Sequence, residues 1–290
     1  MRASFVALIL AATPVASEPV LEQLSVYVWE RPERYFGGWS AIEVAKGGMT
    51  FTAIGDNAQS YYGTFQRDGD RITGVSRGPV GALTDIDGVA FFRKGTEELN
   101  DSEGLAVFPD GRFAVSFERT SRIIVYDEDA LPVRIELPRE VNGLAENGGV
   151  EALAIDGEGR LIAIPETVPK DAPGFPVWRQ DGNGWETVGH LKRTQGFRPV
   201  GADVGPDGRL YVLERAFRLI GFQSRIRAFD LDAFAPVGAL LWVDSLLAFD
   251  NLEGLSVWED AGGALRFTMI SDDNYLSVQR TEIVEFRLTQ

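Results

Sequence analysis

Cysteine is absent from this 290-residue sequence, and histidine occurs once, at position 190. Without cysteine the chain can form no disulfide and carry no lipoprotein-type anchor, so a hydrophobic core must stabilise it. Zinc sites of the usual His and Cys type are excluded, as is nearly every Ser-His-Asp mechanism that does not use His190. Because residues 188–191 read as an outer strand, we interpret His190 as a structural or surface residue.

Long hydrophobic runs are also missing, because no stretch approaches the roughly 20 apolar residues that a membrane helix needs. One shorter apolar run, over residues 5–12, follows Arg2 and precedes the small residues 15–17 (VAS). This order is typical of an export signal. We therefore predict a signal peptide over residues 1–17, cut after Ser17, a mature domain over residues 18–290, and a periplasmic or secreted location.

Positive charge is scarce, since 28 lysine and arginine residues face 43 aspartate and glutamate residues, for a formal net charge of −15. Such a chain is a poor partner for nucleic acid or anionic membranes and a better one for cations. Acidity alone can also serve only to keep an exported protein in solution. Lysine occurs only at positions 46, 94, 170 and 192, so few lysine side chains could hold a highly anionic ligand. We expect a monomer with a small-molecule ligand.

A short motif recurs along the mature chain at intervals typical of a propeller or a solenoid. Clear copies are residues 101–107 (DSEGLAV), 149–155 (GVEALAI) and 251–257 (NLEGLSV), and weaker ones are residues 39–44 (WSAIEV) and 200–204 (VGADV). Each is followed by a glycine-rich turn and further strand-like runs, about four strands per repeat. We predict an all-β fold, a single β-propeller of four-stranded blades with five repeats beginning near residues 40, 103, 151, 200 and 253.

The last repeat has room for only three strands before the sequence ends. Residues 24–29 can add the missing outer strand, close the ring and remove an open sheet edge. Residues 87–92 read as an extra strand, which leaves open a sixth, degenerate blade within residues 80–100. The alternative architecture, a pair of β-sandwiches, does not explain a motif that recurs at similar intervals.

Acidic residues stand where the first strand of a repeat begins and where the second strand ends. These two points lie side by side on one face of a propeller. The eight acids are Glu103, Glu151 and Glu253 on first strands, and Asp56, Glu118, Glu166, Glu214 and Asp272 on second strands. Clustered carboxylates repel one another, so such a ring needs protons or cations. Oxygen-only ligands favour Ca²⁺, or Mg²⁺ where the geometry is tighter.

A purely structural interpretation of these acids is also open. Glu118 precedes Arg119 and Glu214 precedes Arg215, so the acids can form ion pairs that tie neighbouring blades together. For any single glutamate we favour that interpretation. For the whole set we favour cation binding, because structural pairing does not require acids at both ends of a hairpin.

The sequence resembles the phytase-like family of exported bacterial propellers, described by an esterase-like activity of phytase, over nearly the whole mature chain. The motifs that carry the resemblance include residues 38–42 (GWSAI), 101–106 (DSEGLA), 251–255 (NLEGL), 271–274 (SDDN) and 279–281 (QRT). The resemblance implies a propeller with metal-assisted phosphoester hydrolysis and these site acids: Glu103, Glu151, Glu253, Asp272 and Asp273. Ser40 and Val200 depart from the pattern, because these two repeats lack the leading glutamate.

Our first functional hypothesis is a divalent-metal-dependent hydrolase of a phosphoester or phosphodiester. Glu151 is the candidate base, and Arg119, Arg215 or Arg280 can neutralise developing charge. A second hypothesis is a non-catalytic, calcium-stabilised binding module, and a third is a lactone or carboxylic-ester hydrolase. The fold does not decide among them.

Overall fold

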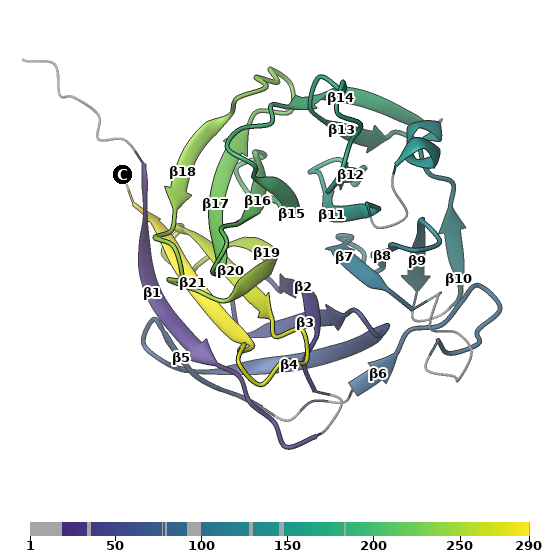
Figure 1. Ribbon diagram of the computed structural model, residues 1–290. Helices are drawn as coiled ribbons and strands as arrows, with labels where there is room; N and C mark the ends of the chain where they lie inside the picture. The colour runs from purple at the N-terminus through teal and green to yellow at the C-terminus, as the bar shows by residue number, and fades with distance from the viewer. Residues whose placement is uncertain are drawn as a thin grey trace, which may run out of the picture.

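Five four-stranded antiparallel sheets stand around a central channel in the computed structural model, and one of them carries a short fifth strand (Figure 1). The structure describes residues 19–33, 36–76, 78, 80–91, 100–127, 130–144, 148–182 and 184–289. In each sheet the first strand of the repeat lies next to the channel, and the later strands lie progressively further out. The prediction of a five-bladed all-β propeller is therefore confirmed.

The blades follow one another in chain order. Blade 1 contains β2 (Trp39–Val44), β3 (Thr50–Gly55), β4 (Gln59–Asp68), β5 (Arg71–Val75) and the short β6 (Val80–Ala82). Blade 2 contains β7 (Ser102–Val107), β8 (Phe113–Phe117), β9 (Arg122–Asp127) and β10 (Ala130–Ile135). Blade 3 contains β11 (Val150–Ile155), β12 (Leu161–Pro165), β13 (Phe175–Gln180) and β14 (Trp185–Leu191). Blade 4 contains β15 (Arg198–Val204), β16 (Leu210–Phe217), β17 (Phe222–Phe229) and β18 (Ala239–Val243). Blade 5 contains β19 (Asn251–Glu259), β20 (Leu265–Asp272), β21 (Glu282–Thr289) and β1 (Val20–Val28).

The hydrophobic core is divided into five clusters, one between each pair of neighbouring blades. The cluster between blades 5 and 1 is rich in aromatic side chains, and Trp29 stacks on Trp39 with ring centroids 5.3 Å apart. Because inner strands are buried on both faces, their sequences are almost continuously apolar rather than alternating. Five clusters for five junctions account for a closed ring that needs no disulfide.

The N-terminal strand closes the ring as predicted. β1 pairs antiparallel with β21 from Val20, opposite Thr289, to Val28, opposite Glu282, so both ends of the chain lie in one sheet (Figure 1). The strand begins at Val20, four residues before the predicted start. The predicted signal peptide, residues 1–17, lies outside the described residues.

The extra strand predicted over residues 87–92, and the sixth blade that the sequence left open, are not found in the described part of residues 80–100. β6 joins blade 1 by pairing with β4, and a single bridge links Thr84 to Ala90. This segment supplies no four-stranded unit of its own, because its first strand is used as an additional edge of blade 1. Residues 92–99 lie outside the described residues.

Helix is nearly absent from the described residues, which contain only the 3₁₀ turn η1 (Arg139–Gly143). In the described part of the chain, no helix has the length and apolar character required to cross a membrane.

Glycine follows the leading glutamate in two of the clear repeats because the first strands approach one another closely around the channel. A Cβ at Gly104 would lie 2.7 Å from the backbone oxygen of Glu151 in the next blade. A Cβ at Gly254 would lie 2.8 Å from the Cα of Ala41. The glycines are therefore needed for close packing at the axis, whereas this packing does not require a glutamate at the preceding position.

Candidate functional site

Carboxylates surround a cavity of about 260 Å³ at one mouth of the central channel. Its lining contains eight acids: Asp56, Asp101, Glu103, Glu118, Glu151, Glu166, Glu253 and Asp272. Among the described residues, one basic side chain, Arg215, lines it together with Ser40 and Asn274. The cavity therefore carries a large excess of negative charge in a small volume.

A β-bulge in every first strand places one side chain at this mouth. In β11 the pairing with β12 passes from Val150 to Ala152 and skips Glu151. Equivalent shifts occur at Ser40, at Glu103 with Gly104, at Val200 and at Glu253. A bulge re-aims the extra residue, and three of the five positions are glutamates that line the cavity. Val200 instead packs into the core between blades 4 and 5.

The rest of the ring comes from one position on the second strand, directly after the residue that pairs with the residue preceding the bulge. It is occupied by Asp56, Glu118, Glu166 and Asp272 in four blades, as the strand registers show. In blade 3 the pair before the bulge is Val150 with Pro165, and Glu166 follows. In blade 4 the corresponding pair is Pro199 with Glu214, so the equivalent residue is Arg215. A guanidinium therefore stands where the other four blades carry an acid.

Glu214 does not reach the cavity, contrary to the sequence-based placement. Its fully buried carboxylate accepts hydrogen bonds from Arg225 Nε at 2.7 Å and from Arg227 Nε at 2.6 Å. Strand β16 extends to Phe217, so Glu214 is an interior residue of a long strand and faces the opposite side from Arg215. This acid fits the structural interpretation, and its partners are Arg225 and Arg227 rather than Arg215.

Asp273 and Arg280 also lie away from the cavity lining. Asp273 Oδ1 accepts hydrogen bonds from the backbone N–H groups of Gly38 at 3.0 Å and Tyr275 at 3.1 Å, and Thr281 donates to Oδ2. This carboxylate therefore ties the β20–β21 loop to the start of blade 1. Arg280 is half-exposed and pairs with Glu282 at 2.8 Å.

Arg119 lies at the rim, where its Nε donates to Asp101 Oδ2 at 2.9 Å. Asp101 was missed from the sequence because it precedes the strand that begins at Ser102. The signal was its place as the first residue of the motif, two residues before Glu103. Ser40 and Asn274 were missed as lining residues because they are uncharged.

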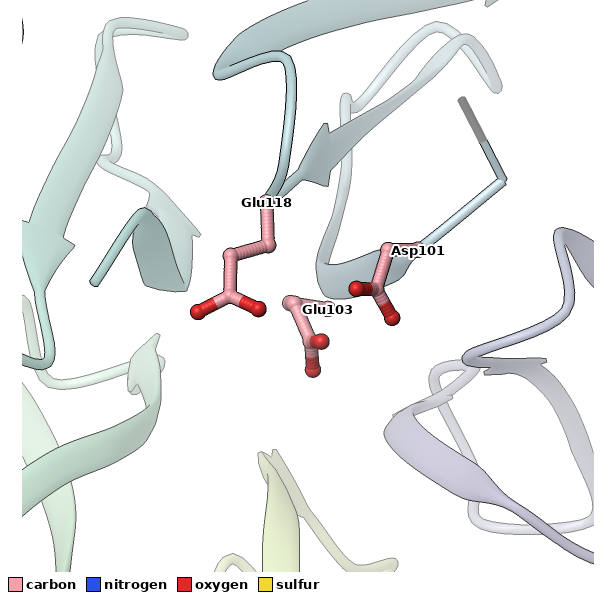
Figure 2. A group of neighbouring side chains, drawn as sticks. All are labelled: Asp101, Glu103 and Glu118. Atoms are coloured by element: carbon pink, nitrogen blue, oxygen red, sulfur yellow. The ribbon is translucent and has the colours of Figure 1, made fainter. Parts of the chain in front are cut away.

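The carboxylates of Asp101, Glu103 and Glu118 converge in blade 2. One oxygen from each lies within 4.8 Å of the others, and Figure 2 shows the three side chains turned toward the same opening. Three oxygen donors at this separation are compatible with a divalent cation.

Burial and mutual repulsion raise the pKa values of several of these acids. Burial, together with Glu253 and Asp101, raises the pKa of Asp56 to about 7. Burial, followed by Asp101 and Glu166, raises the pKa of Glu118 to about 7. The pKa of Asp272 rises to about 8 through burial and Glu253. Burial and neighbouring carboxylates also raise the pKa values of Glu103 and Glu151 well above their ordinary range. Ionisation of these acids therefore has an energetic cost that bound cations would reduce.

A second acidic pair, Glu43 and Asp203, lies toward the other end of the channel and lines a separate cavity of about 340 Å³. Both residues belong to repeats that lack the leading glutamate, and each follows the bulged residue of its strand by three positions. Ser256 Oγ donates to Glu43 at 3.2 Å, and the backbone N–H of Val257 donates to Asp203 at 2.6 Å. Burial raises both pKa values, that of Asp203 to about 7. The repeats could have revealed this pair, because an acid follows the position of the missing glutamate by three residues in both repeats, in residues 39–43 (WSAIE) and 200–203 (VGAD).

His190 lies in the outer strand β14, opposite Pro176, as the sequence indicates.

Known proteins of low sequence identity are similar to this chain. An α-L-arabinofuranosidase from Podospora anserina, solved with cellotriose, is 11% identical over 92% of this chain and 97% of that chain, with a TM-score of 0.54. An aldose sugar dehydrogenase from Streptomyces coelicolor, solved with PQQ, is 14% identical over 94% of this chain and 100% of that chain, with a TM-score of 0.49. At these identities the likeness concerns the fold alone. No protein of curated function matches the sequence. The family model for phytase-like proteins, described as esterase-like activity of phytase, matches residues 34–275, and the chain belongs to that family.

Proposed function

We propose that this protein is an exported, divalent-metal-dependent hydrolase that acts on a phosphoester or phosphodiester as a monomer. The observation that carries the proposal is the lining of the channel mouth, where eight carboxylates and one guanidinium surround about 260 Å³. Structural ion pairing does not account for this excess, because the acids outnumber the basic groups that could neutralise them. A bound cation does account for it.

The residues that fit a cation best are Asp101, Glu103 and Glu118. They offer oxygen donors only, which suits Ca²⁺ or Mg²⁺ and not the softer metals. Glu103 has no hydrogen-bond or ion-pair partner among the described residues, so its oxygens are available. Arg119 holds Asp101 from the rim and so positions one ligand. When bound, the metal would polarise a phosphoryl oxygen and lower the pKa of a coordinated water.

The chain's own residues supply the remaining functions. Glu151, whose carboxylate also lacks a partner among the described residues, stands beside this group and can take a proton from the attacking water. Its raised pKa brings it closer to neutrality, where a general base works best. Arg215 is the guanidinium that can receive an anionic group of the substrate inside the cavity. Arg280, which pairs with Glu282, has no part in this proposal.

The test is turnover by the mature protein with and without Ca²⁺ or Mg²⁺. Aryl phosphate monoesters and diesters probe the proposed reaction, and aryl carboxylic esters and lactones probe the alternative hydrolase. The Glu103→Gln variant should lose metal-dependent turnover, whereas a variant of the outer-strand His190, such as His190→Gln, should keep it. Metal binding without turnover of any of these substrates would favour the calcium-stabilised binding module.

A further inference from the structure

Large apolar side chains are exposed in an unusual concentration next to the acidic mouth. Among the described residues, twelve such side chains are more than half exposed, and six of them lie at the end of β16 or on the three loops that follow β16, β18 and β20. We call these six the apolar rim: Phe217, Leu219, Ile220, Leu247, Leu276 and Val278. The other six are distributed over β1, β4, β10, β18 and the segment before β18. Exposed apolar groups that gather in one place commonly mark a binding surface.

The three loops of the apolar rim adjoin one another. The loop between β16 and β17 meets the loop between β18 and β19 where the Leu247 side chain lies against Gly221. The latter loop is joined to the β20–β21 loop through Asp250, which accepts hydrogen bonds from the Gln279 side chain at 3.1 Å and from the Arg280 backbone at 3.0 Å. The rim is therefore one continuous surface over blades 4 and 5.

Arg215 and Asn274 connect the apolar rim to the cavity. Arg215 lines the cavity, and its guanidinium lies 5.2 Å from the centre of the Phe222 ring. The Phe222 ring in turn lies 5.6 Å from that of Phe217 in the rim. Asn274 also lines the cavity and lies in the loop that carries Leu276 and Val278.

Two leucines of the apolar rim are held in an unfavourable backbone conformation. Leu219 has a φ of 49° and Leu247 a φ of 66°, in the left-handed region that leucine rarely adopts. Their side chains are nevertheless 94% and 55% exposed, so they gain little burial in return. Strained residues that expose apolar groups are expected where a ligand covers them.

We propose that the apolar rim receives the alkyl or aryl part of a single amphiphilic phosphoester whose anionic group enters the cavity. This inference rests on the proposed function and names the substrate class. The cavity is small and charged, so it suits only the polar group, and the rest of the molecule must lie outside the mouth. Because Arg215, the basic group for the anion, belongs to blade 4, the remainder of the substrate is directed over the loops of blades 4 and 5.

The experiment measures binding rather than turnover. Methyl, butyl and octyl phosphate are titrated into the calcium-loaded protein by isothermal titration calorimetry. Affinity should rise roughly fourfold for each methylene that the rim covers. In the double variant Leu219→Asn, Leu247→Asn this dependence on chain length should flatten, while methyl phosphate binds as before. Asparagine is the non-glycine residue best suited to left-handed backbone, so the variant should fold.

Leu131→Asn is the matched control, because Leu131 is 67% exposed and lies on β10, the outer strand of blade 2, rather than on the loops of blades 4 and 5. Equal affinities for the three phosphates, or equal losses in the control and the rim variant, would overturn the proposal. Phosphatidylcholine vesicles that bind the wild type but not the rim variant, with no preference for octyl phosphate, would also overturn it and assign the rim to a membrane.

The outcomes separate this inference from the hydrolase proposal. Rim-dependent binding of octyl phosphate without hydrolysis of octyl p-nitrophenyl phosphate keeps the rim and refutes the hydrolase. Metal-dependent hydrolysis of ethyl p-nitrophenyl phosphate with no preference for longer chains keeps the hydrolase and refutes the rim.

Discussion

Glu166 and Arg215 occupy equivalent positions in blades 3 and 4, and their side chains meet at 3.5 Å across the blade boundary. Arg215 also contacts Glu253 of blade 5. Burial opposes the charged form of Arg215, but the charges of Glu253 and Glu166 outweigh it and raise the pKa of the guanidinium. One basic residue of blade 4 thus links acids of blades 3 and 5.

Replacing Arg215 should change stability and cation affinity in opposite directions. In Arg215→Gln the acids lose their nearest basic neighbour, so the metal-free protein should lose about 2 kcal/mol of unfolding free energy. Calcium affinity should rise because the cavity becomes more negative, and affinity for methyl phosphate should fall. Differential scanning fluorimetry and calorimetry measure these quantities. A metal-free variant that melts above the wild type would show that Arg215 does not stabilise the ring.

Glu151 and Glu214 should respond differently to the same substitution. Glu151→Gln relieves repulsion, so the metal-free protein should melt at the same temperature or higher, while metal binding and turnover weaken. Glu214→Gln leaves Arg225 and Arg227 without a buried counter-charge, and should cost about 3–5 kcal/mol. Thermal melts of the two metal-free variants check this pair. A clear drop in melting temperature for Glu151→Gln, with metal affinity intact, would assign Glu151 a structural role.

Calcium should raise the melting temperature of the mature protein. A ligand that binds only the folded state adds about 2.7 kcal/mol at a free concentration one hundred times its Kd. A chelator should reverse the gain, and elemental analysis should detect the metal in the untreated protein. Glu103→Gln should reduce the calcium response. If the chelator leaves the melting curve unchanged and no metal is found, the carboxylate ring does not hold a cation.

The metal-free protein should become less stable as pH rises from about 4 to about 8. Folding raises the pKa of Asp56 and Glu118 to about 7 and that of Asp272 to about 8, from unfolded values near 4. Over this window the folded state binds more protons than the unfolded state, so stability is highest at the acidic end and is lost as these groups ionise. Melting temperatures across the pH range, with and without calcium, measure the slope. Calcium should flatten it, and a metal-free melting temperature that increases over this window would contradict the repulsion argument.

The N-terminal strand should be required for folding. Deleting residues 18–30 removes β1 and Trp29, which is 3% exposed and stacks on Trp39. Blade 5 would then keep three strands with an open edge, and the protein should be insoluble or unfolded. A deletion that ends at residue 19, before β1 begins, is the control. A normal melt of the longer deletion would show that the ring does not depend on β1.

The repeat made the fold predictable, because a motif that recurs five times at similar spacing and ends one strand short allows few architectures. The limits of individual strands were harder to predict. Strand β16 extends beyond the channel mouth to Phe217, so its end does not mark the residue that lies at the mouth. An error of one residue in the predicted register exchanges Glu214 for Arg215 on the channel face.

Asp272 and Asp273 show the same limit at a strand end. They are adjacent and chemically alike, yet Asp272 lines the cavity and Asp273 accepts backbone hydrogen bonds that fix a loop. Asp101 shows the converse, since it lines the cavity from the residue before a strand. Periodicity identifies the side chains within a strand, but the chain direction at its ends depends on tertiary contacts.

The closure of blade 5 has a consequence for the rate at which the protein folds and unfolds. The Thr289 side chain donates to the backbone oxygen of Val20 across 269 positions of sequence, so this sheet forms only after the whole chain has been brought together. Contacts of such long range slow folding. Detachment of β1 would open the ring at this sheet, and it requires eight residue pairs to separate together. The lifetime of the native ring should therefore increase with the strength of the β1–β21 pairing.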